Sequence, residues 1–141
     1  MNFLLDTNVV SEWVKPRPDT GVTTWLAEAD EDRVFISVVT LAELRHGIER
    51  LPPGARRDRL DAWLTGQLPA RFETRIVPVD AETAHGWGRV MARGQAAGDP
   101  VGTMDAFIAA TAEQHGLTLV TRNVRDFEAL GIGLVNPWRE G

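Results

Sequence analysis

Short apolar runs alternate along the whole chain with longer stretches that have the spacing of amphipathic helices. The runs predict strands at 4–5, 34–36, 75–79, 117–120 and 134–135. Between them, apolar residues recur at i, i+3, i+4 and i+7 over 22–29 and less strictly over 60–68. Further helical apolar stripes lie within 41–51, 84–91 and 104–112. Strands that alternate with helices are typical of an α/β domain, so we expect a mainly parallel, five-stranded sheet.

Proline, aspartate and glycine residues give this pattern its boundaries. Pro78 cannot donate a hydrogen bond within a sheet, so the third strand is expected at a sheet edge. Asp80 is a typical N-cap, and Gly116 and Gly131 are expected to end helices. The chain has 141 residues and no internal repeat or low-complexity tract. We therefore expect one domain over residues 1–141.

Cysteine is absent from the chain, which excludes disulfides and thiolate metal sites and favours an intracellular protein. The first apolar run is too short for a signal peptide or a membrane span, so a cytoplasmic protein without membrane contact is expected. The net charge of −5 argues against broad binding to nucleic acid, which positive charge drives. Lys15 is the only lysine; the arginines suit bidentate phosphate contacts, although a coding bias also explains them.

Acidic side chains follow two of the predicted strands at the points where these strands end. Asp6 comes directly after the first strand, in LLDTN. Thr121 ends the fourth strand and opens TRNVRDF, which puts Asp126 in or just after the following loop. Ligands of open parallel sheets bind beyond the carboxyl ends of the strands, so both acids are expected at the same edge. Asn8 and Thr121 can add an amide and a hydroxyl to this site.

Two further acids lie in helical stretches that are otherwise largely apolar. Glu43 is early in the helix that follows the second strand, in SVVTLAEL, and Asp105 lies in MDAFIAATA, with no further charge before Glu113. A helix that is apolar nearly all round is buried, and a buried carboxylate is unfavourable unless it is paired or binds a metal. Taken singly, each of the four acids is better explained by an ordinary structural role, such as accepting hydrogen bonds from a neighbouring loop.

Taken together, the four acids form a set of hard oxygen ligands without histidine or cysteine, which suits Mg²⁺ or Mn²⁺. Carboxylates at one strand edge can hold one or two such ions, and the number is left open. Two ions roughly 4 Å apart would position a water and stabilise the leaving oxygen in phosphodiester cleavage. The candidate metal ligands and catalytic acids are Asp6, Glu43, Asp105 and Asp126.

Four stretches occur in the order LLDTNVVSE, SVVTLAEL, MDAFIAATA and LTLVTRNVRDF. They resemble PIN-domain ribonucleases, and most closely the VapC-type toxins of bacterial toxin–antitoxin pairs. The resemblance runs from Met1 to about Trp138. It implies an α/β/α sandwich, RNA cleavage with Mg²⁺ or Mn²⁺, a homodimer and a small VapB-type antitoxin partner. It also implies that the four acids match the acidic quartet of the family and that Thr121 matches its active-site hydroxyl.

Two other kinds of function are alternatives to a ribonuclease. A receiver-type phosphoryl-transfer protein also ends its first strand in Asp, but it needs a lysine near the site, and Lys15 precedes every plausible later strand. A DxDxT phosphatase signature is also missing. A non-catalytic RNA-binding module would keep the same fold. The four acids argue against this module, because RNA binding alone favours fewer negative charges.

Several other polar residues are not expected to be metal ligands or catalytic acids. The three histidines follow helical patterns without a matching nucleophile, so they are expected at the surface. Asp99 is expected in a turn, Glu12 on a solvated helix face, and the arginines of 56–59 on another solvated face. Arg122 and Arg125 flank the predicted site loop and are expected either to contact phosphate or to form salt bridges.

Overall fold

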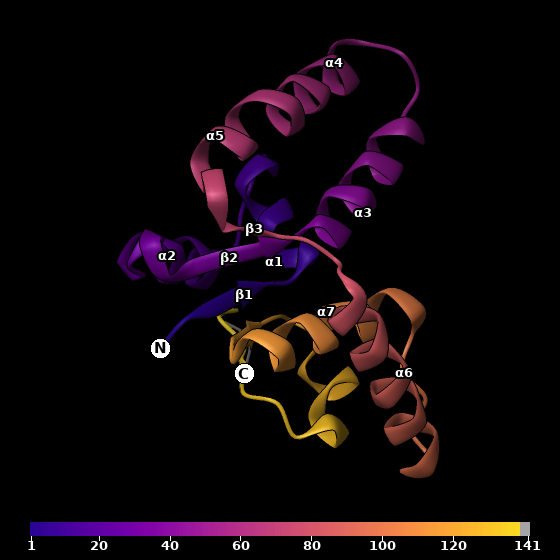
Figure 1. The fold of residues 1–141 in the computed structure, drawn as a ribbon. Coiled ribbons are helices and arrows are strands. Elements are labelled where there is room, and N and C mark those ends of the chain that lie inside the picture. Colours follow the sequence, from indigo (N-terminus) through magenta and orange to yellow (C-terminus); the bar gives the residue numbers. More distant parts are fainter. Residues whose placement is uncertain (139–141) are drawn as a thin grey trace.

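The computed structural model describes residues 1–138, and a parallel sheet of five strands lies at its centre (Figure 1). The strands are β1 Phe3–Leu5, β2 Val34–Ser37, β3 Ile76–Val77, β4 Thr118–Val120 and β5 Leu134–Val135. Their order is β3-β2-β1-β4-β5, and all four pairings are parallel. The predicted five-stranded parallel sheet is therefore confirmed, and the third strand lies at an edge, as Pro78 indicated.

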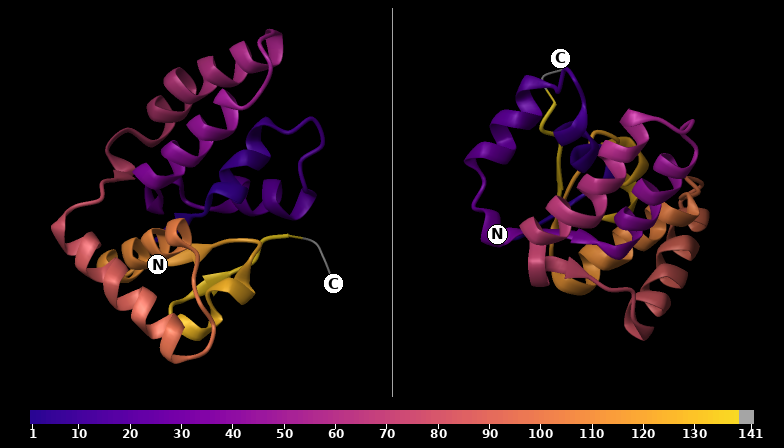
Figure 2. Two further views of the ribbon diagram at one scale, coloured as in Figure 1. Left: turned by 90° about the vertical axis from the view of Figure 1, so that its right-hand side faces the viewer. Right: turned by 90° about the horizontal axis from the view of Figure 1, so that it is seen from above.

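Helices cover both faces of the sheet, which confirms the three-layer α/β/α arrangement (Figures 1 and 2). They are α1 Thr7–Ser11, α2 Thr20–Glu28, α3 Val38–Glu49, α4 Ala55–Ala62, α5 Leu68–Phe72, α6 Ala81–Ala96 and α7 Thr103–His115. The α3–α4 hairpin stands on one side of the sheet, and α6 with α7 lies on the other (Figure 2). No helix within residues 1–138 is long and apolar enough to cross a membrane.

Successive side chains of the central strands pack alternately into two separate hydrophobic cores. Leu4 and Leu119 belong to the core beneath α6 and α7, whereas Leu5 and Val120 belong to the core on the side of α2 to α5. This alternation follows from the two-residue period of a strand. Because both faces are covered, the strands are largely apolar, as is typical of parallel sheets. A polar residue directly after such a strand is therefore held at the rim by a rigid core.

Several predicted boundaries are confirmed by their capping geometry. The Asp80 side chain accepts a hydrogen bond from the backbone N–H of Thr83 at 3.0 Å, within a capping box that opens α6. Gly116 ends α7 with φ of 63°, and Gly131 has φ of 74°, a left-handed conformation that glycine adopts without strain.

Two predicted elements differ in extent from the observed ones. The third strand is only Ile76–Val77, because a 3₁₀ turn reaches Arg75 and Pro78 cannot extend the pairing. The helix expected over 60–68 is present but longer and less regular: α4 already begins at Ala55, and a π-helical turn at Trp63–Gln67 joins it to α5. A π turn holds more residues than an α turn, which explains the loose apolar spacing in this stretch.

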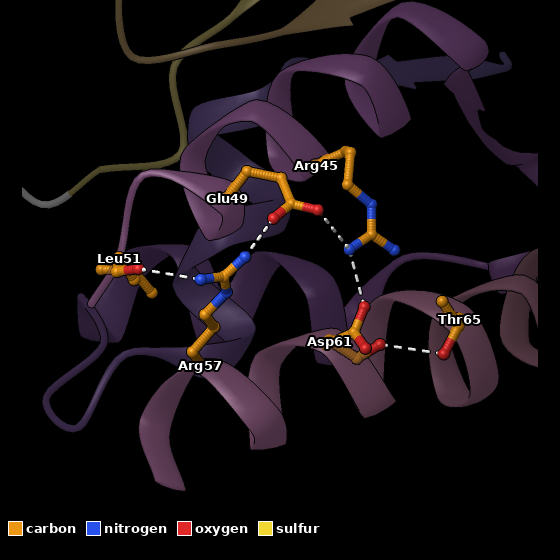
Figure 3. A network of polar contacts seen from close by, with 6 residues as sticks. All are labelled: Arg45, Glu49, Leu51, Arg57, Asp61 and Thr65. Carbon is orange, nitrogen blue, oxygen red and sulfur yellow. Dashed lines mark hydrogen bonds and ion pairs between the residues drawn. The ribbon is translucent and has the colours of Figure 1, made fainter. Parts of the chain in front are cut away.

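Ion pairs join α3 to α4 along the hairpin (Figure 3). Arg45 of α3 contacts Asp61 of α4 at 2.7 Å, and Arg57 of α4 pairs with Glu49 of α3. Arg45 also lies 3.9 Å from Glu49, so the four charges form one network. Single surface pairs contribute little, but a network with shared partners fixes the rotation of one helix against the other. One face of α4 therefore packs against α3 through these ion pairs.

Candidate active site

The predicted site lies at the carboxyl edge of the sheet, where β1 and β4 end side by side. Asp6 follows β1 directly, and its backbone N–H donates to the carbonyl of Val120 at 2.9 Å. The same residue is the N-cap of α1, because its carboxylate accepts a hydrogen bond from the N–H of Thr7 at 2.8 Å. Only 5% of Asp6 is exposed. The main chain of Asp6 is thus bound to the end of β4, and its carboxylate is bound to the start of α1.

The hydroxyl of Thr121 connects Asp6 to β4. Thr121 is fully buried, and its Oγ1 donates to Asp6 Oδ2 at 2.8 Å. The same oxygen accepts hydrogen bonds from Asn8 Nδ2 at 3.4 Å and from the N–H of Asn123 at 3.0 Å. Asn8 Nδ2 also lies 3.5 Å from Asp6 Oδ2. The hydroxyl and the amide expected from the sequence therefore meet at the Asp6 carboxylate.

Glu43 projects from α3 towards the first turn of α1. Thr7 Oγ1 donates to Glu43 Oε1 at 2.6 Å and lies 3.1 Å from Thr40 Oγ1, one helical turn before Glu43. Glu43 lies near the middle of α3, not early in it, because the helix begins immediately after β2, with Ser37 as its N-cap. Thr7 was not recognised from the sequence, although its place directly after Asp6 is the signal that indicates it.

Asp105 and Asp126 complete the set from the other side of Asp6. Asp105 is half-buried in the first turn of α7, where the helix dipole favours a negative charge. Asp126 ends the 3₁₀ turn Val124–Asp126 after β4 and is exposed. Within residues 1–138, neither carboxylate has a hydrogen bond or an ion pair. Both acids therefore have oxygen atoms available to a ligand.

Electrostatic interactions show that the four acids lie near one another. Burial raises the pKa of Asp6; hydrogen bonds from Thr121 and Thr7 oppose this, and the charges of Glu43 and Asp126 raise the pKa further. Burial, followed by the charges of Asp6, Asp126 and Glu43, raises the pKa of Asp105 to about 6. None of the four acids forms an ion pair with a base within residues 1–138. Their negative charge is therefore not neutralised by an ion pair in the described part of the chain.

The donor set has the chemistry of a hard-cation site but is not closed around one. Carboxylate oxygens from Asp6, Glu43, Asp105 and Asp126 are the ligand type that Mg²⁺ and Mn²⁺ prefer. In the part of the chain that the structure describes, no group of three or more acidic, histidine or cysteine side chains is arranged to hold a metal ion.

One prediction about the surroundings of the site is wrong. Glu12 is not on a solvated helix face: only 2% of it is exposed. Its Oε1 accepts a hydrogen bond from the N–H of Asp19 at 2.9 Å, and its Oε2 pairs with Lys15. The 15–19 segment folds back over Glu12, and this burial cannot be seen in a helical pattern. Glu12 thus fixes a loop beside the site.

The histidines and Asp99 are at the surface, as expected, whereas one arginine of 56–59, Arg57, is half-buried and paired with α3. The three histidines and Asp99 are exposed, and the backbone N–H of Asp99 closes the turn after α6 by donating to Gly94. Arg122 and Arg125 are exposed on the loop that also carries Asp126. The guanidinium of Arg122 lies 5.4 Å from the centre of the Trp138 ring, a cation–π distance.

Nearly the whole chain matches one protein family. The family model described as "PIN domain" matches residues 3–132. The chain belongs to the PIN-domain family. This match also removes the receiver-type alternative.

Individual PIN-domain relatives resemble the chain over nearly its whole length. The "VapC ribonuclease Y4jK" of Sinorhizobium fredii is 36% identical, over 96% of this chain and 97% of the relative. The "Toxin FitB" of Neisseria gonorrhoeae is 36% identical, over 98% and 99%. The crystal structure of FitAcB from the same organism superposes with a TM-score of 0.92 at 36% identity, over 98% of this chain and 99% of that one. The chain is therefore a homologue of VapC- and FitB-type toxins of toxin–antitoxin systems.

Proposed function

We propose that this PIN-domain protein is a metal-dependent ribonuclease that acts as the toxin of a toxin–antitoxin pair. The observation that carries the proposal is the convergence of four acids from four separate elements on one strand edge, without an ion-paired base within residues 1–138. Such a cluster repels a phosphodiester by itself, and it attracts a divalent cation. The ribonuclease name of the Sinorhizobium relative supports the same reaction.

The residues have distinct roles in this proposal. Asp6, Glu43, Asp105 and Asp126 would hold Mg²⁺, with Mn²⁺ as a substitute. A bound ion would activate a water and stabilise the leaving oxygen during phosphodiester cleavage. Thr121 and Thr7 keep Asp6 and Glu43 in fixed orientations through hydrogen bonds of 2.8 Å and 2.6 Å. These bonds pre-organise the cluster, since carboxylates held by neighbouring donors need less reordering when a ligand arrives.

Cleavage of RNA by the purified, antitoxin-free protein tests this function. We expect cleavage with Mg²⁺ or Mn²⁺, and none with a chelator. Asp6→Asn and Asp105→Asn should abolish cleavage with unchanged circular dichroism. Asp99→Asn is the matched control, because Asp99 is an exposed turn residue outside the cluster. Cleavage that survives chelation, or an active Asp105→Asn variant, would refute the proposed site.

A non-catalytic RNA-binding module with the same fold is the second candidate. It predicts a different response to the same substitutions. If the acids only repel RNA, Asp6→Asn and Asp105→Asn should strengthen RNA binding, and no variant or metal should bring about cleavage.

The partners of the protein follow from the same proposal. The resemblance to VapC-type toxins favours a VapB-type antitoxin, an RNA substrate and a homodimer in the cytoplasm. Sedimentation tests the dimer: we expect twice the 15.6 kDa chain mass at micromolar concentration. A sedimenting species with the mass of one chain would contradict it.

A further inference from the structure

A groove leads away from the acid site along α4. Its first part, a hollow of about 280 Å³, is lined by Thr7 and Glu43 at one end and by Arg56 and Trp63 at the other. A second hollow of about 750 Å³ continues from Arg56 and Trp63. We call this the α4 groove, and its lining includes Val14, Pro16, Arg56, Arg59, Trp63 and Gly66. Because the hollows share residues, the groove is continuous with the surroundings of Glu43.

The two faces of α4 differ in how their charges are compensated. Arg57 and Asp61, one turn apart, are paired with α3 (Figure 3). Arg56 and Arg59 lie on the adjacent face, are exposed, and line the groove. Within residues 1–138 these two arginines form no ion pair, although the chain has 20 acidic and 15 basic residues. Two cations are thus left open to an outside ligand beside a negatively charged site.

The opposite wall of the groove is held in place from inside the molecule. Val14 and Pro16 flank Lys15, whose amine pairs with the buried Glu12. Glu12 also accepts a hydrogen bond from the N–H of Asp19, which closes the loop behind this wall. The shape of the groove therefore does not depend on a free loop.

Glycines line the groove where a larger side chain would fit. Gly47 of α3 and Gly66 of the π turn each have no neighbouring atom within 4 Å of the place where a Cβ would lie. Neither has a positive φ that would require glycine. Glycine is a poor helix former, so local packing and backbone conformation do not explain these two residues. They leave the backbone open to a ligand that approaches closely.

We propose that the α4 groove binds the single-stranded RNA that enters the acid site, with Arg56 and Arg59 contacting its phosphates. This deepens the proposed ribonuclease function and rests on it. Sites for single strands combine cations that follow the backbone with apolar and aromatic surface for the bases, and the groove offers both through the two arginines and Trp63. The acid cluster repels a polyanion, so attraction must come from cations close by.

Salt dependence of RNA binding tests the phosphate contacts directly. The probe is a fluorescein-labelled single-stranded RNA oligonucleotide, with a chelator present to prevent cleavage. For Arg56→Gln and for Arg59→Gln, we expect the slope of log K against log salt to fall in magnitude by about 0.7 each. The double variant should lose both increments. Arg89→Gln is the control, because Arg89 is exposed on α6, far along the chain from the groove.

A second pair of variants tests occupancy of the groove without removing an arginine. Gly66→Glu and Gly66→Gln place side chains of nearly equal size where there is room for them. We expect Gly66→Glu to weaken RNA binding several-fold more than Gly66→Gln, since only the former adds a negative charge. The melting temperatures of the two variants should agree, which separates charge in the groove from damage to the fold.

The binding measurements test the α4 groove, and the cleavage assay tests the ribonuclease function, so the two can fail independently. Reduced slopes support the groove even if the wild-type protein fails to cleave RNA, a result that would refute only the nuclease. Wild-type slopes for the double arginine variant overturn the inference, even if cleavage is normal. If that variant binds RNA normally but binds its antitoxin more weakly, the groove is a peptide site and the inference is also overturned.

Discussion

Thr121 Oγ1 lies 2.8 Å from Asp6 Oδ2 and joins the ends of two neighbouring strands through one buried hydrogen bond. Asp6 follows β1, and Thr121 follows β4. The hydroxyl is fully buried and the carboxylate nearly so, so water cannot replace this donor. Burial raises the pKa of Asp6, and the hydrogen bond from Thr121 opposes this increase. The bond therefore favours the charged carboxylate, which is the form that binds a metal.

Thr121→Val should destabilise the protein by about 1–3 kcal/mol, because it leaves a buried carboxylate without its nearest side-chain donor. The pKa of Asp6, already raised, should rise further. A raised carboxyl pKa disfavours the folded state once the pH exceeds the unfolded value, so the loss should be larger near neutral pH than near about pH 4. Urea unfolding at both pH values measures it. Thr121→Ser keeps the hydroxyl and is the control; equal losses for both variants would contradict the role of the bond.

Asp105→Asn should stabilise the metal-free protein near neutral pH while it abolishes cleavage. The pKa of Asp105 is raised to about 6, so ionisation penalises the folded state as the pH rises from the unfolded value through 6. Because Asp105 is only half-buried, the gain is discounted to about 1 kcal/mol. It should shrink as the pH falls below 6. Thermal unfolding with a chelator measures the gain, and a pH-independent or negative effect would contradict the electrostatic explanation.

Lys15→Met should cost about 1–2 kcal/mol, more than is usual for a half-exposed lysine, because it leaves the buried Glu12 carboxylate without its cation. Glu12→Gln in the same chain should recover part of this loss, since it removes the unpaired charge. A double-mutant cycle by chemical denaturation gives the coupling energy between the two residues. Additive effects would show that the pair does not stabilise the 15–19 loop.

Much of the fold could be predicted from the sequence because the apolar periodicity of the elements agrees with the capping residues at their ends. The run at 4–5 is apolar, and the run at 117–120 is apolar except for Thr118, which is typical of strands covered on both faces. Asp80 and Gly116 are recognisable by their capping chemistry. The placement of Asp6 and Asp126 followed from strand ends, which meet at one edge in a parallel sheet. These features depend only on local chemistry and on one rule of topology.

The features that the sequence did not reveal depend on how elements rotate against each other. The contact between Thr7 and Glu43 requires the orientation of α3 relative to α1, which no local pattern specifies. Burial of Glu12 depends on the path of the segment after it, and the π turn at Trp63–Gln67 appears in the sequence only as a loose apolar spacing. Whether the four acids form a metal site is likewise not settled by spacing, and it stays a prediction.

Diffraction from crystals soaked in Mn²⁺ tests the central claim, that the four acids form a divalent-cation site. We predict an anomalous difference peak bound by carboxylate oxygens of Asp6 and Asp105, with Glu43 or Asp126 in the same cluster, and loss of that peak in Asp105→Asn crystals. Asp99→Asn crystals should keep it. An empty cluster in well-ordered crystals with Mn²⁺ bound elsewhere would contradict the account and favour a module that binds RNA without cleaving it.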